Sequence, residues 1–85
     1  MFVIIVYDVQ SSRSGKLRKK LRQYLNWKQN SVFDGDITES EMEYIHDFIQ
    51  GYVRDDEQVI LYEIDGSDFV IEKVFGQEVV DKQFL

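Results

Sequence analysis

The chain has 85 residues, 44% of them hydrophobic and 14% aromatic, which suffices for one small folded domain and excludes a disordered segment. Its net charge of −6 argues against a uniformly basic surface for nucleic acid, and the absence of cysteine excludes disulfides and thiolate metal sites. No apolar stretch reaches the roughly 20 residues of a membrane span, so we expect a cytoplasmic protein that does not contact membranes.

The first predicted element is a strand from Phe2 to Val9, a continuous apolar run typical of a central strand buried on both faces. Asp8 stands at its C-terminal end, where α/β and related sheets place ligands. Asp8 is therefore a candidate ligand for Mg²⁺ or Mn²⁺, although a turn aspartate that begins a loop would look the same. Because one carboxylate makes a poor metal site, a symmetric dimer would have to supply a second Asp8.

A polar loop is predicted from Gln10 to Gly15, with a serine as the helix N-cap, and a helix is predicted from Lys16 to Leu25. The candidate N-caps are Ser11, Ser12 and Ser14. The apolar face of the helix repeats at helical spacing and consists of Leu17, Leu21, Tyr24 and Leu25.

A basic block surrounds this helix, because there is no acidic residue from Val9 to Phe33. The block carries a charge of +7 in a chain of net charge −6, so the remaining residues sum to −13. Such a block predicts contact with the phosphates of nucleic acid, and the alternative is a solvated helix face. The candidate nucleic-acid-binding residues are Arg18, Lys19, Lys20, Arg22 and Lys28.

The next predicted strand runs from Asn30 to Ile37, and Gly35 within it suggests a bulge or kink that splits it in two. The polar residues before its apolar part, Ser31 among them, would line the same cleft as Asp8 if this strand lies beside the first. Trp27 and Phe33 are able to stack on nucleic-acid bases, but we favour packing roles for both, with Phe33 in the core and Trp27 against the first helix.

The second half of the chain predicts one helix and two strands. Thr38 and Glu41 form a capping box, and the helix they begin is predicted to run to about Tyr52. Two strands follow, predicted at Glu57–Ile64 and Phe69–Phe75. The hairpin turn between them is predicted at Asp65–Asp68.

The predicted element order is therefore β-α-β(β)-α-β-β. Two helices on one face of a mainly antiparallel sheet make an α+β sandwich of ferredoxin-like type. We expect one ferredoxin-like domain over residues 1–76. Residues 77–85 would form a C-terminal tail or strand for contact with a dimer mate or another partner.

Three motifs at this spacing resemble a known family: an apolar strand ending in Tyr-Asp-Val, a basic helix, and Gln-Asn-Ser-Val-Phe-acid-Gly-acid. The matching residues are Tyr7, Asp8, Val9, Arg18, Lys20 and the run from Gln29 to Asp36. The family is the second core CRISPR-associated protein, the small subunit of the spacer-acquisition machinery. The resemblance extends over most of the chain, in length and element order as well as in motifs.

The resemblance implies a homodimer in which a C-terminal strand of one chain adds to the sheet of the other. It implies that Asp8 of both chains faces a shared divalent metal, and that some members cleave RNA or DNA with it. It further implies that the dimer bridges dimers of the CRISPR integrase subunit. By position, the resemblance makes Asp8 the metal ligand. The residues that would contact phosphate or the nucleic-acid backbone are Tyr7, Arg18, Lys20 and Lys28. Ser31 and Phe33 would lie beside the metal cleft and the dimer interface.

Two functions remain open at this point. The first is a homodimeric, Mg²⁺-dependent endonuclease, acting on RNA or DNA with Asp8 as its catalytic residue, which also scaffolds the integrase complex. The second is a non-catalytic DNA-binding subunit that bridges the integrase and does not need its Asp8 site for spacer integration. A metabolic or regulatory ferredoxin-like dimer is a third, which the match of motifs disfavours.

Overall fold

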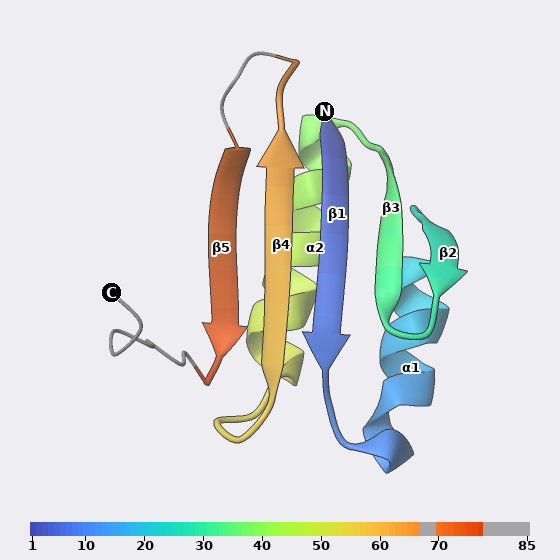
Figure 1. Cartoon of the computed structure of the whole chain (residues 1–85), viewed down its shortest axis with the longest axis vertical. Helices are drawn as coiled ribbons and strands as arrows, with labels where there is room; N and C mark the ends of the chain where they lie inside the picture. The colour runs from blue at the N-terminus through green and yellow to red at the C-terminus, as the bar shows by residue number, and fades with distance from the viewer. Residues whose placement is uncertain (67–69, 78–85) are drawn as a thin grey trace.

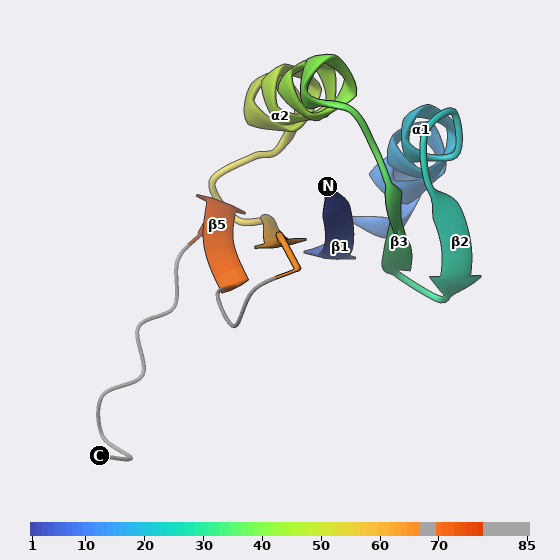
Figure 2. The same cartoon turned by 90° about the horizontal axis from the view of Figure 1, so that it is seen from above.

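A computed structural model describes residues 1–66 and 70–77 of the chain. Its elements are β1 (Phe2–Asp8), α1 (Ser11–Leu21), β2 (Asn26–Gln29), β3 (Val32–Asp36), α2 (Glu39–Tyr52), β4 (Gln58–Ile64) and β5 (Val70–Gly76). The strands form one sheet in the order β2-β3-β1-β4-β5, and every neighbouring pair is antiparallel (Figure 1). Both helices lie on one face of that sheet (Figure 2), so the predicted α+β ferredoxin-like sandwich is confirmed.

The core lies between the sheet and the helices, and β1 runs through its middle. Because side chains alternate along a strand, Val3, Ile5 and Tyr7 point to the helices and are buried. The other face of β1 carries side chains that are only half-buried: Phe2, Ile4 and Val6. The prediction that β1 is buried on both faces is therefore wrong for the single chain, because no described element covers this open face of the sheet.

The two helices begin in different ways. In α2 the predicted capping box is present: Thr38 Oγ1 accepts from the Glu41 N–H at 3.1 Å, and Glu41 Oε1 accepts from the Thr38 N–H at 2.9 Å. In α1 the helix starts at Ser11, before the predicted Lys16, and its N-cap is Gln10, whose side chain makes no capping bond. The prediction of a serine cap is wrong, because the serines lie inside the first turns and Ser14 Oγ donates to the Ser11 carbonyl.

A short hairpin, β2 and β3, precedes α2. β3 lies within the strand predicted from Asn30 to Ile37, whereas β2 is an additional strand that the sequence did not predict. The chain turns between them at Asn30, whose φ of 39° lies in the left-handed region. The sheet irregularity lies between Trp27 and Gln29 on β2. Gly35 instead pairs in regular register with Val3, so the predicted bulge at Gly35 is wrong.

The second half of the chain follows the predicted order. The strand predicted from Glu57 begins one residue later, because Glu57 is a buried loop residue. The predicted turn at residues 65–68 and the tail at 77–85 fall largely outside the described residues, so the role of the tail stays a prediction. Neither helix of the described chain has the length and hydropathy that a membrane-spanning helix needs.

Gly76 closes β5 at a position that only glycine fits. Its φ is +83°, and an added Cβ would collide with the Glu57 carbonyl oxygen and lie 2.9 Å from Val53 Cγ2. Gly76→Ala should lower the free energy of unfolding by more than about 1 kcal/mol, measured by urea denaturation.

Gly15→Ala is the matched control for this substitution. Gly15 lies inside α1, and a Cβ there would meet nothing within 4 Å. Because alanine favours the helix, the control should raise stability by about 0.5–1 kcal/mol. Equal effects of the two substitutions would contradict the geometry described for Gly76.

Candidate nucleic-acid site at the end of β1

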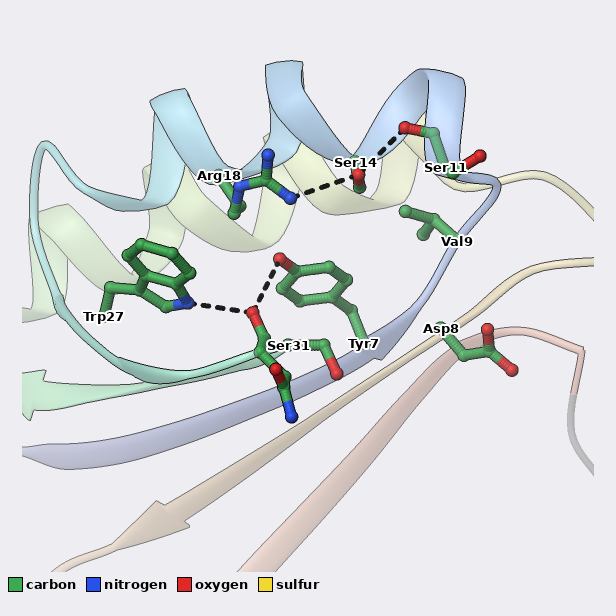
Figure 3. A pocket seen from close by; sticks show the side chains of 9 residues that line it. Tyr7, Asp8, Val9, Ser11, Ser14, Arg18, Trp27 and Ser31 are labelled. Atoms are coloured by element: carbon green, nitrogen blue, oxygen red, sulfur yellow. Dashed lines mark hydrogen bonds between the residues drawn. The ribbon is translucent and has the colours of Figure 1, made fainter.

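An open pocket of about 450 Å³ lies at the C-terminal end of β1, between α1 and the β2–β3 hairpin. Figure 3 shows its side chains, which combine aromatic rings, hydroxyl groups and one guanidinium. The lining residues are Tyr7, Asp8, Val9, Ser11, Ser14, Arg18, Trp27, Asn30 and Ser31. The sequence predicted Tyr7, Asp8, Arg18 and Ser31 as site residues, and the fold brings these four together.

Tyr7 and Asp8 are consecutive on β1, so their side chains point to opposite faces of the sheet. Tyr7 is buried, and its hydroxyl makes a long hydrogen bond of 3.5 Å to the Asn30 carbonyl. Asp8 is exposed, and its carboxylate points away from Trp27 and Arg18 (Figure 3). The carboxylate thus borders the pocket from the open face of the sheet, whereas the tyrosine belongs to the helix side.

The residues around Asp8 fit a metal only in part. On the neighbouring strand β4, the residue paired with Asp8 is Gln58, whose neutral side chain adds no second carboxylate. In the described part of the chain, no three His, Asp or Glu side chains come together in a group that would hold a metal ion. Mg²⁺ accepts one or two carboxylates when water and substrate phosphate complete its octahedron. Asp8 therefore fits as one ligand of a shared site, and further ligands would have to come from outside the described part of this chain.

The candidate cations do not form a single basic face. Arg18 and Arg22 lie beside the Trp27 ring, whereas Lys20 lies on the opposite flank of α1, with its Nζ 3.3 Å from the Tyr44 hydroxyl. Lys19 and Lys28 are exposed. Among residues 1–66 and 70–77, none of these five cations forms an ion pair with a carboxylate, so their charge is available to a ligand.

Ser31 lines the pocket, and Phe33 lies in the core next to it. Phe33 is fully buried, with its ring centroid 6.2 Å from that of Tyr7, so it belongs to the core as favoured from the sequence. The Ser31 carbonyl accepts a hydrogen bond from the Tyr7 N–H at 3.1 Å. Phe33 therefore lies under the pocket and not on its wall.

A buried ion pair that sequence reasoning missed holds the loop after Asp8. Glu57 is 2% exposed, and its carboxylate accepts from Arg13 Nε at 2.8 Å and from the backbone N–H groups of Gln10 and Arg54 at 3.1 Å each. The Tyr52 hydroxyl donates to the Arg13 carbonyl at 2.6 Å. We call this group the Arg13–Glu57 latch. It removes Arg13 from the cations that are available to a ligand.

The latch sets the charge of Glu57. The Glu57 pKa is lowered to about 2, mainly by the hydrogen bond from Arg13 against the opposing effect of burial, and in smaller part by the two backbone donors. The partners lie 44 residues apart in the sequence. Neither Arg13 nor Glu57 belongs to a local sequence motif, so the sequence alone did not predict that they pair.

Comparison with known proteins gives a consistent result. The model of the family described as CRISPR associated protein Cas2 matches residues 1–70. A protein named CRISPR-associated endoribonuclease Cas2 from Methanocaldococcus jannaschii is 44% identical over 92% of this chain and 69% of its own. The Nanoarchaeum equitans protein of the same name is 35% identical over 98% of this chain and 91% of its own. A crystal structure of cas2 superposes with a TM-score of 0.70 at 30% identity, covering 98% of this chain and 83% of the other.

Removal of the Glu57 carboxylate should change how stability depends on pH. The folded-state pKa of about 2 lies below the ordinary value of 4.5, so the contribution of Glu57 is complete above pH 4.5 and is lost as pH falls toward 2. Glu57→Gln should therefore be less stable than wild type at pH 7 and lose less stability between pH 4.5 and 2, measured by denaturant midpoints. Glu43→Gln, which removes an exposed carboxylate of α2, is the control and should keep the wild-type decline. A wild-type decline in Glu57→Gln would refute the role of the latch.

Proposed function

The chain belongs to the CRISPR-associated Cas2 family, and on that premise we propose that it is a metal-dependent endoribonuclease that acts as a homodimer in spacer acquisition. The observation that carries the proposal is the position of Asp8: an exposed carboxylate at the end of β1, beside a pocket that Arg18 lines. The name shared by the relatives supports RNA as the substrate, and DNA phosphodiesters offer the same chemistry.

The open face of the sheet supports the homodimer. Half-buried apolar side chains from the two central strands form a continuous patch on this face: Phe2, Ile4, Val6, Ile60, Tyr62 and Ile64. Such apolar patches on small proteins usually mark interfaces. Asp8 continues the row of Phe2, Ile4 and Val6, so a twofold contact through this face would bring the Asp8 residues of both copies to one interface.

A pair of Asp8 carboxylates would hold Mg²⁺ or Mn²⁺, and such an ion supplies positive charge where a phosphodiester is cleaved. The chain's own residues do the rest. Arg18 offers a guanidinium to a phosphate on the helix side, and the Arg13–Glu57 latch fixes the loop that follows Asp8. Asp8 is the only acid among the pocket-lining residues of the described chain, so hydrolysis would depend on it alone.

A second candidate function is a bridging subunit that grips DNA for the integrase without cleaving it. The observation that favours it is the charge of α1 and its surroundings, where five cations form no ion pair with a described carboxylate, and Arg18 among them lines the pocket. Phosphate binding would survive the loss of Asp8, whereas cleavage would not. Both functions would operate in one dimer if cleavage were dispensable for integration.

Substitution of Asp8 separates the two functions. Asp8→Asn keeps the shape of the side chain and removes the charge that a metal needs, so cleavage of single-stranded RNA with Mg²⁺ should fall at least about a hundredfold, whereas affinity should change little. Asp36→Asn is the matched control, because Asp36 is an exposed carboxylate at the opposite end of the sheet, paired with Phe2.

Two results would count against the nuclease proposal. One is wild-type cleavage by Asp8→Asn, and the other is no cleavage by the wild type with Mg²⁺ or Mn²⁺ over a wide pH range. Spacer integration, measured with the integrase subunit, then reports on bridging. Integration by Asp8→Asn at the wild-type rate would show that cleavage is dispensable for it.

Neutralising the unpaired cations in α1 and directly after it should weaken binding to all nucleic-acid sequences alike. The variant that carries glutamine at Arg18, Lys19, Lys20 and Arg22 should reduce the slope of log affinity against log salt concentration by as much as about 3 for a single strand, measured by fluorescence anisotropy. Arg54→Gln, in the loop after α2, is the control and should leave the slope nearly unchanged. A salt-independent affinity in the wild type would refute phosphate binding by α1.

A further inference from the structure

Trp27 is a large aromatic side chain held in a fixed position at the edge of the molecule. It is the only tryptophan in the chain, it lies on the edge strand β2, and it is 46% exposed. Its indole N–H donates to the Asn30 carbonyl at 2.8 Å, which fixes the plane of the ring. The ring is on the helix side of the sheet, since Trp27 pairs with the buried Phe33, and is therefore remote from the open face.

Positive charge surrounds this ring. The guanidinium carbons of Arg22 and Arg18 lie 4.6 Å and 5.9 Å from the ring centroid, within the range of cation–π attraction. Within the described residues, Arg18 donates one hydrogen bond, to Ser14 Oγ at 3.2 Å, which leaves its other N–H groups available to a ligand. An aromatic ring from β2 and a guanidinium from α1 thus lie close together in the lining of the pocket (Figure 3).

The remaining walls suit a small polar and aromatic ligand. Hydroxyl groups of Ser11, Ser14 and Ser31 line the pocket, and its volume of about 450 Å³ lies within the range of small-molecule sites. A flat π-face beside a cation is the combination by which proteins bind unpaired nucleotides, because the base stacks while its phosphate meets the charge. A base inside a duplex has both faces covered by its neighbours and offers none to the ring.

We propose that Trp27 is a stacking platform for an unpaired nucleobase whose phosphate binds Arg18, so that the pocket accepts a nucleotide of a single strand. The proposal rests on the proposed function, because it specifies the form of nucleic acid that the same site takes. Arg22 supports the ring from α1, and the hydrogen bond to Asn30 keeps it in place. Each chain carries a complete nucleotide pocket of this kind, whereas the Asp8 site needs a second copy.

The fluorescence of the single tryptophan tests the proposal on the intact protein, in buffer without divalent metal so that no cleavage occurs. The ligands are a short single-stranded oligonucleotide, a blunt duplex of the same sequence and a single strand of abasic residues of the same length. Stacking should quench the fluorescence most strongly with the single strand, in which every base is unpaired. The abasic strand carries phosphates without bases and should bind without quenching. The duplex exposes base faces only at its two ends, so it should quench far less than the single strand.

Substitution of Trp27 provides the second measurement. Because a stacked base contributes strongly to affinity, Trp27→Ala should weaken binding of the single strand by roughly five- to a hundredfold in an anisotropy titration. Trp27→Phe keeps an aromatic face and should lose much less. Neither variant should change affinity for the duplex, and circular dichroism checks that both are folded.

The outcomes distinguish this proposal from the proposed function. Single-strand binding without quenching, or with unchanged affinity in Trp27→Ala, would overturn the stacking platform and leave nucleic-acid binding intact. Equal quenching by the duplex would also overturn it. No binding of any of the three ligands would overturn both, and would leave Trp27 as a contact for a protein partner. If Trp27→Ala does not fold, the wild-type titrations and Trp27→Phe decide the question.

Discussion

The alternation of side chains along β1 is the constraint on which the rest of the structure depends. Successive residues point to opposite faces of the sheet, so Val3, Ile5 and Tyr7 build the core under the helices while Asp8 faces the other way. A one-residue shift of register would reverse both faces at once. The same alternation divides the candidate functions: nucleotide contact lies on the helix side, and the acidic group lies on the open side beside a half-buried apolar patch.

The Arg13–Glu57 latch keeps the end of this strand in place. It joins the first turn of α1, the end of α2 and the start of β4, which are far apart in sequence. A buried carboxylate is costly unless it is paired and hydrogen-bonded, and Glu57 meets both conditions. Through the bond to the Gln10 N–H, the latch orders the residues that immediately follow Asp8. One of the seven bases of the basic block is thus structural, and the others are distributed over α1, the residue after its end and β2.

Local patterns predicted much of this fold, and contacts between distant residues explain what they missed. The capping box at Thr38, the element order and the place of Asp8 at a strand end all followed from neighbouring residues. The hairpin at Asn30 was missed because a left-handed asparagine leaves a weaker signal than Gly35 nearby. The latch, the division of the cations and the open face of β1 depend on how elements pack, which no short segment of the sequence encodes.

Under the proposed function, nucleic-acid binding is complete in one chain, whereas cleavage needs two chains joined through the open face. Ile60→Glu tests it, because Ile60 is half-buried on that face and contacts neither the pocket nor the latch. Sedimentation velocity should show a dimer for the wild type and a monomer for the variant. The monomer should keep its affinity for single-stranded RNA and lose Mg²⁺-dependent cleavage. A monomeric variant that cleaves at the wild-type rate would contradict the claim.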